Sequence, residues 1–534
     1  MNNTSENNTR EHKSRVEKAS EHATCANEPR VHKTCEELFA GYQHSILGNP
    51  QEEVTGIAYR SDTISPGDAF FCIVGLKADG HSFAQDAINR GARVIVCERK
   101  LYLADASDVT MVIVPNSRRA MAQISARFYD NPSQAFSLVG VTGTNGKTTT
   151  TYLVEHIARV AGNKTGIIGT VGVHINQEEH PASRTTPESP DLQHIFADMR
   201  DAGVDVCAME VSSHALDLQR PLCSHFAVTA FTNLTQDHLD YHHTFEAYFE
   251  AKALLFSREY PAKRVICIDD KWGRELHARV CNEHAYADAD AANEIITTGF
   301  SDDALVHPIS VEYAPHSTHI TLDCAGEVLT FTYPLVGKFN VSNVMLACGI
   351  ALQLGIPGTV IARALEDVPQ IPGRLQRVSD TSSVAVFVDY AHTPDALKKA
   401  LDCVMHITKG QTIVVFGCGG DRDKAKRSIM GKASLAAHYV IVTSDNPRSE
   451  DPRAIIDDIV SGMKEQPEKF EVEPDRRKAI ARALACAKPG DSVLIAGKGH
   501  ETYQLIGSQV LHFDDTEVAR EELHRAGLDN HAQE

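Results

Sequence analysis

The chain has 534 residues, which is too long for one hydrophobic core and indicates about three or four domains. Its formal net charge of -19 excludes a broad surface for nucleic acid or anionic membranes, so an anionic substrate must be met by a few local basic groups. The thirteen cysteines form no Cys-x-x-Cys pair, and no apolar run approaches the about 18 residues of a membrane span. We therefore expect a cytoplasmic enzyme with reduced cysteines, no nucleic-acid partner and no membrane insertion.

The N-terminal part divides into a tail and a first domain. Residues 1–36 are rich in Asn, Glu, His, Lys and Thr and almost free of large apolar side chains, so they are predicted to form a disordered tail. From 37 to 135, β-type runs at 69–74 and 93–97 lie on either side of a helical run at 83–90. This alternation predicts a small α/β domain.

A phosphate-binding loop is predicted at residues 137–150, where an apolar strand leads into a glycine-rich loop and a helix. The loop reads Gly143-Thr144-Asn145-Gly146-Lys147-Thr148. Glycines allow backbone N–H groups to surround an anion, the helix N-terminus adds partial positive charge, and a lysine and a hydroxyl contact phosphate and Mg²⁺. The generic P-loop spacing would need glycine where this chain has Val141, so the shorter Gly-Thr-Asn-Gly-Lys-Thr form carries the prediction of a nucleoside triphosphate ligand.

The rest of the second predicted domain, 136–371, supplies two candidate functional groups. Glu210 follows a predicted strand at 204–209, the position at which a P-loop enzyme holds Mg²⁺, although a surface carboxylate would have the same spacing. Lys252 falls on the apolar face of a predicted helix. It either reaches the surface through its long stem or is a functional lysine beside the metal, with its charge altered by burial or modification.

Two asparagines one helical turn apart, Asn340 and Asn343, could read a purine or cap the helix on which they lie. Beyond a Pro and Gly boundary, the third predicted domain, 372–534, has β-type runs at 384–388, 412–416, 439–442 and 492–495, and a polar cluster follows each of them. In a doubly wound parallel sheet the carboxyl ends of the strands line one crevice. We expect a ligand there.

Several of these segments together resemble the Mur ligases of peptidoglycan synthesis. The similarity covers about residues 37–520, in the same order, and is strongest with the branch that adds meso-diaminopimelate to UDP-N-acetylmuramoyl-L-alanyl-D-glutamate. The motifs that carry it are Gly143-Thr144-Asn145-Gly146-Lys147-Thr148, Glu210-Val211-Ser212-Ser213-His214, Asp237-His238-Leu239-Asp240, Asp389-Tyr390-Ala391-His392-Thr393-Pro394 and Asp445-Asn446-Pro447-Arg448. The last motif is specific to that branch.

The resemblance implies an α/β protein with three domains: a mixed α/β domain for the UDP moiety, a central P-loop ATPase with a mainly parallel sheet, and a Rossmann-like domain for the incoming amino acid. It also implies ATP, Mg²⁺ and a carbamate formed on Lys252 from CO₂, with both substrates bound as small molecules by a monomer. The ATP contacts would be Gly143, Thr144, Asn145, Gly146, Lys147, Thr148, Thr149, Asn340, Asn343, Arg374 and Asp389. The Mg²⁺ ligands would be Thr148, Glu210, His238 and Lys252, of which His238 and Lys252 join Lys147 as the catalytic residues.

The resemblance also implies contacts for the two substrates that are joined, the UDP-linked acceptor and the amino acid. For the UDP-linked acceptor they are Ser61, Thr185, Thr186, Ser212 and Arg220. For the amino acid they are Arg422, Asp445, Asn446, Pro447, Arg448, Gly497 and Glu501. The chain departs from the family pattern at Asp62, Gln376 and Phe339, where arginine, glutamate and histidine are usual.

Other functions share parts of this pattern. A Mur ligase that adds L-lysine, or a folylpolyglutamate-type ligase, would use the same phosphate loop and acyl-phosphate chemistry. A non-catalytic nucleotide switch would also use the loop. It would not need polar clusters after four strands of a separate domain, so a ligase is the function that the sequence favours.

Overall fold

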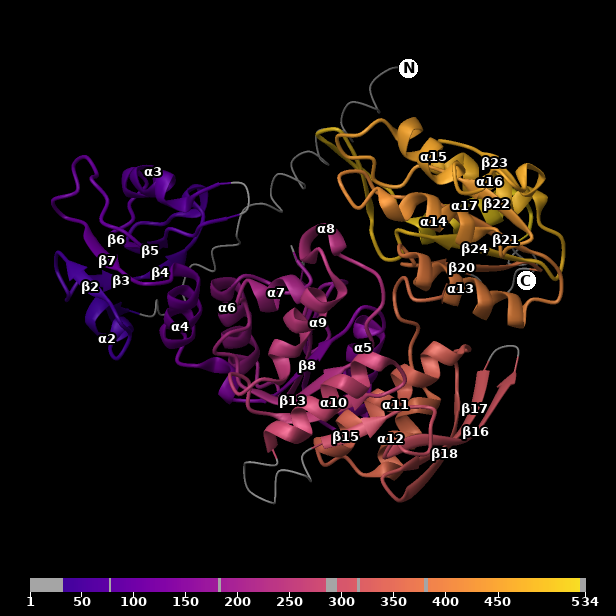
Figure 1. The fold of residues 1–534 in the computed structure, drawn as a ribbon, viewed down its shortest axis with the longest axis horizontal. Helices are drawn as coiled ribbons and strands as arrows, with labels where there is room; N and C mark the ends of the chain where they lie inside the picture. Colours follow the sequence, from indigo (N-terminus) through magenta and orange to yellow (C-terminus); the bar gives the residue numbers. More distant parts are fainter. Residues whose placement is uncertain are drawn as a thin grey trace, which may run out of the picture. The chain divides into compact units, whose positions relative to one another are not determined.

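The computed structural model describes residues 32–75, 78–180, 184–284, 295–314, 317–378 and 383–528. It divides into two compact units, Met1–Ala120 and Met121–Glu534 (Figure 1). The main sheets have five, eleven and six strands, and each falls within one of the three predicted domains. The predicted α/β fold class is confirmed. Most of the predicted tail lies outside the described residues, but ordered backbone already begins at Lys33, inside the segment predicted to be disordered.

The first unit is built on the five-stranded sheet, in the order β2-β7-β6-β5-β4. Strands β4 to β7 are parallel and β2 is antiparallel to β7, while β1 and β3 form a separate pair. The strands are β1 Lys33–Thr34, β2 Ser45–Leu47, β3 Glu53–Val54, β4 Gly56–Ala58, β5 Asp68–Phe71, β6 Val94–Cys97 and β7 Thr110–Ile113. The helices are α2 Cys35–Phe39, η1 Ser61–Thr63, η2 Gly80–Phe83, α3 Ala84–Asn89 and α4 Ser117–Phe128, the last of which spans the division between the units.

The second unit contains the eleven-stranded sheet, in the order β11-β10-β9-β12-β8-β13-β14-β15-β16-β17-β18. Its centre, from β9 to β16, is parallel, and antiparallel strands extend both ends. The strands are β8 Ser137–Thr142, β9 Thr165–Ile168, β10 Val173–Ile175, β11 Glu178–His180, β12 Val206–Glu210, β13 Phe226–Phe231, β14 Lys263–Cys267, β15 Ile295–Thr298, β16 Val306–Ala314, β17 Ser317–Cys324 and β18 Glu327–Tyr333.

Helices cover both faces of this sheet because neighbouring strand residues point to opposite sides. Val139 packs in a cluster with α5, α11 and α12, whereas the adjacent Leu138 packs with α6, α9 and α10. The helices are η3 Pro132–Gln134, α5 Lys147–Val160, α6 Ser189–Asp201, α7 Ser213–Asp217, α8 Leu239–His242, α9 Phe245–Ala253, η4 Leu254–Phe256, α10 Lys271–His284, α11 Lys338–Gln353 and α12 Gly358–Glu366. From their sequence, residues 262–335 are expected to form alternating strands and loops, and the helix α10 corrects that expectation.

The six-stranded sheet has the order β19-β20-β24-β21-β22-β23, with β20 to β23 parallel and β19 antiparallel. Its strands are β19 Gln376–Arg377, β20 Ala385–Asp389, β21 Thr412–Phe416, β22 Tyr439–Val442, β23 Phe470–Val472 and β24 Ser492–Ala496, followed by the hairpin β25 Tyr503–Ile506 and β26 Gln509–His512. The four strands predicted here are confirmed as β20, β21, β22 and β24.

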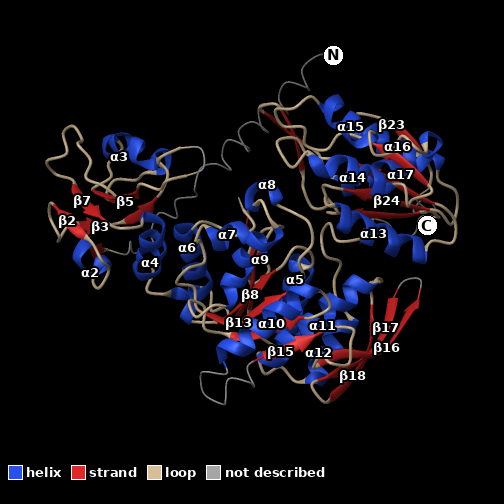
Figure 2. Ribbon diagram, in the orientation of Figure 1, coloured by secondary structure: helices blue, strands red, loops and turns tan. Residues whose placement is uncertain are grey.

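The helices of this last domain again divide between two apolar clusters. One contains α13, α14 and α15 with Val414 of β21, and the other contains α16 and α17 with Val415. Figure 2 labels these five helices in the last domain. The helices are α13 Pro394–Ile407, α14 Ala425–Ser434, α15 Pro452–Val460, η6 Pro467–Lys469, α16 Arg476–Cys486 and α17 Asp515–Arg525. Because helices cover both faces of the sheet, a ligand can approach it at the carboxyl ends of its strands.

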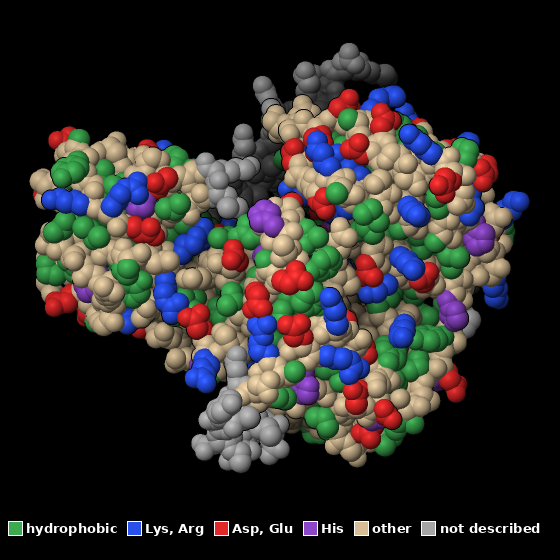
Figure 3. Space-filling model, in the orientation of Figure 1, with side chains coloured by type: hydrophobic (Ala, Val, Ile, Leu, Met, Phe, Trp, Pro, Cys, Tyr) green, Lys and Arg blue, Asp and Glu red, His purple; other side chains and the backbone are tan. Residues whose placement is uncertain are grey.

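No helix among the described residues is both long and apolar enough to cross a membrane. On the face shown in Figure 3, basic and acidic side chains are interspersed and neither sign forms a broad field. This distribution agrees with the expectation from the net charge that anionic ligands are bound by local groups.

Candidate active site

The phosphate loop connects β8 to α5 and needs glycine at two positions. Gly143 and Gly146 have φ values of +144° and +89°, a backbone conformation that side chains disfavour. A Cβ at Gly143 would collide with the hydroxyl of Thr232, and one at Gly146 would collide with the amide oxygen of Asn343. The loop is therefore packed closely between the end of β13 and the start of α11.

The loop is held by hydrogen bonds to the segment after β13. The backbone N–H of Asn145 donates to Asn233 Oδ1 at 3.1 Å, and Thr232 Oγ1 donates to the Asn145 carbonyl at 2.6 Å. The ammonium group of Lys147 donates to the carbonyls of Gly143 and Thr144, at 3.0 and 2.9 Å. Burial lowers the pKa of Lys147, which a nearby anion would oppose.

Glu210 lies at the end of β12 and meets the first turn of α5. Its Oε1 accepts hydrogen bonds from Thr148 Oγ1 at 2.9 Å and from the backbone N–H of Thr170 at 2.8 Å. Arg374, from the segment leading into the last sheet, donates to Thr148 Oγ1 at 2.7 Å. The predicted carboxylate, loop hydroxyl and arginine thus come together, and Glu210 is a buried group of the site and not a surface acid.

Four residues predicted to contact the acceptor form a cluster beside Glu210. Thr186 Oγ1 donates to the Glu210 carbonyl at 2.9 Å and accepts from the Ser212 N–H at 3.1 Å. Arg220 NH1 donates to the Thr186 carbonyl at 3.1 Å, and the Thr185 hydroxyl lies 3.2 Å from that of Thr170. Ser61, the remaining predicted acceptor contact, lies in η1 of the first unit.

Lys252 lies on the apolar face of α9, as the helical spacing predicted, and only 1% of its surface is exposed, so it does not reach the surface through its stem. Its Nζ donates to the Gly143 carbonyl at 2.7 Å and lies 4.5 Å from the ring centre of Tyr248. The Tyr248 hydroxyl is 3.2 Å from Thr144 Oγ1, so the same helix contacts the phosphate loop twice. Burial, followed by repulsion from Lys147, holds the pKa of Lys252 well below its usual value.

His238 lies close to α9, the helix that carries Lys252. Its ring centre is 6.2 Å from that of Tyr248 and 4.8 Å from that of His214, and its Nε2 is 3.3 Å from Asp237 Oδ2. Among the residues that the structure describes, no group of three or more His, Cys, Asp or Glu side chains could hold a metal ion. An ion here would therefore need oxygen ligands from a bound phosphate or from water as well.

A cavity of about 720 Å³ is lined by the phosphate loop, Glu210 and His238. Such a volume suits a ligand the size of a nucleotide. Asn343, Arg374 and Asp389 line the cavity, whereas Asn340 is turned away and its amide donates to the Val336 carbonyl at 2.9 Å. The other lining residues include Asp237, Lys338, Phe339, Tyr390, His392 and Lys399.

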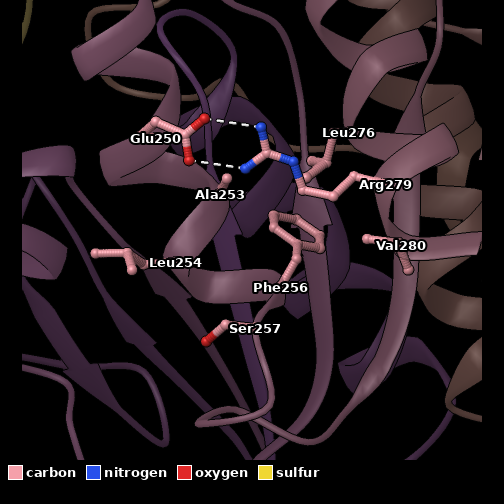
Figure 4. Close-up of a pocket in the computed structure, with 8 residues that line it drawn as sticks. All are labelled: Glu250, Ala253, Leu254, Phe256, Ser257, Leu276, Arg279 and Val280. Atoms are coloured by element: carbon pink, nitrogen blue, oxygen red, sulfur yellow. Dashed lines mark hydrogen bonds and ion pairs between the residues drawn. The ribbon is translucent and has the colours of Figure 1, made fainter. Parts of the chain in front are cut away.

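A second, smaller cavity of about 100 Å³ lies between α9 and α10 (Figure 4). At its edge Arg279 makes two hydrogen bonds of 2.7 Å to the Glu250 carboxylate. The cavity is smaller than most ligand sites and its charged groups are already paired, so it does not compete with the larger one as the candidate site.

The residues predicted to contact the amino acid lie in the segments that follow β21, β22 and β24. Asn446 Nδ2 donates to Glu501 Oε2 at 2.7 Å. A fully buried ammonium group, that of Lys498, lies 3.3 Å from the same oxygen and 3.9 Å from Asp445 Oδ1. Arg448 NH1 donates to the Gly420 carbonyl at 2.8 Å, and its backbone has the unusual φ of 54°.

Comparison with known proteins shows which family this architecture represents. Matches were found to the Mur ligase middle domain at residues 141–351, to the Mur ligase glutamate ligase domain at 373–499, and to the catalytic domain of the Mur ligase family at 53–129. A protein of Geobacillus thermodenitrificans, named UDP-N-acetylmuramoyl-L-alanyl-D-glutamate--2,6-diaminopimelate ligase, is 44% identical over 89% of this chain and 95% of its own. The chain belongs to the Mur ligase family.

Other Mur ligases, including solved structures, are also similar to this chain. A Clostridium botulinum protein with the same name is 41% identical over 91% of this chain and 98% of its own. A solved structure of a diaminopimelate ligase of this name matches with a TM-score of 0.65 and 31% identity, covering 93% of this chain and 99% of that one. The MurF ligase of Thermotoga maritima, solved in complex with ADP, is 19% identical with a TM-score of 0.59 over 88% of this chain and 97% of that one, which shows a shared fold. The chain is thus an ATP-dependent ligase of the Mur type.

Sequence reasoning missed several residues of this Mur ligase site. Thr170, which donates to Glu210, and Tyr248, which contacts Thr144, belong to no motif in the sequence. Lys498 lies in the polar cluster that follows β24, between the predicted contacts Gly497 and Glu501. A lysine between two glycines at a strand end was the one signal that could have identified it.

The close packing of Gly146 gives a direct test of the loop geometry. We expect Gly146→Ala to raise the KM for ATP by roughly tenfold or more, because strain of about 1–2 kcal/mol adds to the collision with Asn343. Gly162→Ala is the matched control, since Gly162 has a similar φ of +94° but nothing within 4 Å of a new Cβ. Steady-state kinetics with varied ATP would contradict the loop geometry if both variants had the KM of the wild type.

Proposed function

We propose that this chain adds meso-2,6-diaminopimelate to the D-glutamyl γ-carboxylate of UDP-N-acetylmuramoyl-L-alanyl-D-glutamate in the synthesis of peptidoglycan precursors, with ATP as the second substrate. One observation carries the proposal: a single cavity has the phosphate loop and Glu210 on one side, and Arg374, Asp389 and other residues of the last domain on the other. The names of the relatives supply the substrates.

The chemistry needs an activated carboxylate. A γ-carboxylate oxygen attacks the terminal phosphorus of ATP, ADP leaves, and an acyl phosphate forms. The amine of diaminopimelate then attacks the carbonyl carbon, phosphate leaves with the former carboxylate oxygen, and the nitrogen loses a proton to give the amide. In this scheme Lys147 and the loop N–H groups hold the phosphates in line and neutralise the charge that develops on them.

The site has groups that fit Mg²⁺. Thr148 Oγ1 and Glu210 Oε1, 2.9 Å apart, offer a hydroxyl and a carboxylate, and hard oxygen ligands are what this ion prefers. When bound, Mg²⁺ would neutralise charge on the phosphate oxygens. We propose that Thr148 and Glu210 hold it, and that His238 and Lys252 contribute from the side of α9.

For Lys252 we propose a carbamate. The lysine has no carboxylate hydrogen-bonded to it among the described residues, and Lys147 shares its acceptor, the Gly143 carbonyl. A neutral amine is the form that attacks CO₂; a C–N bond forms and a proton is released. The product is an anion able to pair with Mg²⁺ beside His238.

The acceptor is proposed to lie along Thr185, Thr186, Ser212 and Arg220, beside Glu210, with Ser61 of the first unit serving the UDP moiety. Asp62 stands where arginine is usual in the family, and it pairs with Arg60 through contacts of 3.0 and 2.6 Å. A monomeric state and a cytoplasmic location stay predictions.

Selection of the amino acid is proposed to rest on Arg448. Diaminopimelate and L-lysine differ by one carboxylate at the far end of the side chain, and a guanidinium group pairs with such a group through two hydrogen bonds. Arg422 would assist it, and Glu501 would receive an ammonium group. Pro447 stiffens the turn that presents Arg448.

We expect Arg448→Ala to lower kcat/KM for diaminopimelate by two or more orders of magnitude, because losing one partner of a buried ion pair costs roughly 3–5 kcal/mol. The KM values for ATP and for the UDP-linked acceptor should change little. Arg453→Ala, another arginine near the same turn, is the control. Normal use of diaminopimelate by Arg448→Ala would refute the assignment of the far carboxylate.

The overall reaction is tested by phosphate release. Wild-type protein is expected to release phosphate only when ATP, UDP-linked dipeptide and diaminopimelate are all present. Release from ATP alone would favour a nucleotide switch, and release with a folate acceptor would favour a folylpolyglutamate-type ligase.

A further inference from the structure

The hairpin β25–β26 is joined to the turn that carries Arg448. The N–H of Arg448 donates to the Leu505 carbonyl at 3.0 Å, and the N–H of Gly507 donates to the Arg448 carbonyl at 2.7 Å. The N–H of Leu505 donates to Asn446 Oδ1 at 2.9 Å, and Gln504 Nε2 donates to the Asp445 carbonyl at 2.7 Å. The hairpin therefore fixes the backbone of the turn from Asp445 to Arg448.

Lys498 extends this connection into the charged cluster. Its ammonium group, which is fully buried, donates to the carbonyl of Tyr503, the first residue of the hairpin. The same group contacts Glu501 Oε2 at 3.3 Å and Asn446 Oδ1 at 3.4 Å, and it lies 5.6 Å from the centre of the Tyr503 ring. The ring is thus close to the carboxylates that the proposed function assigns to the amino acid.

The Tyr503 side chain is available to a ligand. It remains 38% exposed, and no hydrogen bond to its hydroxyl is found among the residues that the structure describes. Burial and then Glu501 raise the pKa of Tyr503, while Arg448 and Arg422 oppose them. The raised pKa means that the phenol retains its proton at neutral pH, so it can donate a hydrogen bond. Its hairpin is bonded to the backbone of Arg448, and its ring lies beside Lys498 of the charged cluster.

We propose that Tyr503 is a specificity-determining residue of the amino-acid site, whose hydroxyl donates a hydrogen bond to the carboxylate at the far end of the diaminopimelate side chain. Arg448 and Arg422 neutralise that carboxylate, and the phenol adds a directed donor at the open side of the site. The hairpin places this donor and Arg448 together, because the two share a backbone hydrogen-bond network. This inference rests on the proposed function of Arg448.

The test is the variant Tyr503→Phe, which keeps the ring and its contact with Lys498 and removes only the hydroxyl. The KM for diaminopimelate is expected to rise roughly tenfold or more, as for other hydrogen bonds to charged groups. The values of kcat, KM for ATP and KM for the UDP-linked acceptor should stay within about twofold. Tyr313→Phe is the matched control, since Tyr313 is also a strand tyrosine with 38% exposure and lies outside the cavity and the amino-acid cluster.

The outcomes are distinct. An unchanged KM for diaminopimelate in Tyr503→Phe would overturn the inference, and so would a parallel rise of all three KM values, which indicates a structural role. Arg448→Ala, measured in the same assay, distinguishes failure of the Tyr503 assignment from failure of the proposed function. If Arg448→Ala loses diaminopimelate use and Tyr503→Phe does not, only the tyrosine assignment fails; if wild-type protein makes no diaminopimelate product, the proposed function fails.

Discussion

Replacing Lys147 by alanine is expected to abolish ATP-dependent ligation while the protein remains folded. The ammonium group sits at the start of α5 and donates to the carbonyls of Gly143 and Thr144, so it already points along the phosphate loop. It would supply the point charge that offsets the charge developing on the transferred phosphoryl group. The variant changes none of the apolar residues that form the two clusters of the sheet, so the protein is expected to fold.

The measurement is single-turnover formation of ADP, combined with thermal unfolding of the variant. Lys263→Ala is a matched control, because Lys263 also donates to a backbone carbonyl, that of Gln353 at 2.9 Å, but lies away from the cavity. Lys263→Ala should turn over like the wild type. Substantial turnover by folded Lys147→Ala would reject the role assigned to the loop.

The second large effect is expected at Lys252. Lys252→Ala should be nearly inactive, since the proposed carbamate would be lost together with the contact to the Gly143 carbonyl. A short carboxylate such as acetate is expected to restore part of the activity by occupying the space of the missing anion. Burial lowers the pKa of Lys252 and so favours the neutral amine, which is the form that the proposed reaction with CO₂ requires.

Two controls separate a carbamate from a merely structural lysine. The same carboxylate should not rescue Lys147→Ala, whose missing group is a cation. Wild-type protein equilibrated with ¹³C-labelled CO₂ should show one protected carbamate signal by NMR that Lys252→Ala lacks. Wild-type activity in Lys252→Ala, or no such signal in active wild-type protein, would end the carbamate proposal.

Much of the fold could be predicted because the strands are buried, regular and followed by polar residues. The runs 412–416 and 439–442 coincide with β21 and β22, and the glycine-rich loop joins a strand to a helix as its sequence requires. The helical period also placed Lys252 on a buried face. These are local properties, which a periodic pattern records.

The parts that could not be predicted depend on contacts between distant segments. Thr170 and Glu210 are far apart in the sequence but share a hydrogen bond, and Tyr248 reaches back to Thr144. Nor does sequence spacing show that the hairpin after β24 would be bonded to the turn at Arg448. Such pairings are decided by the order of strands in the sheets, which motif spacing alone does not fix.

Two departures from the family pattern have partners in the structure, and the third lies in the cavity. Asp62 pairs with Arg60 in the first unit, and Gln376 accepts a hydrogen bond from the N–H of Gly373 at 2.9 Å. Phe339 lines the large cavity beside Asn343. None of the three departures falls in the phosphate loop, residues 143–148.

The central claim, addition of diaminopimelate to the UDP-linked dipeptide, is tested most directly by the mass of the product. Wild-type protein is incubated with ATP, the UDP-linked dipeptide and an equimolar mixture of meso-diaminopimelate and L-lysine. We expect one new product, heavier than the acceptor by diaminopimelate less one water, with one phosphate released for each amide formed. A product carrying L-lysine, or phosphate release without a new amide, would contradict the account.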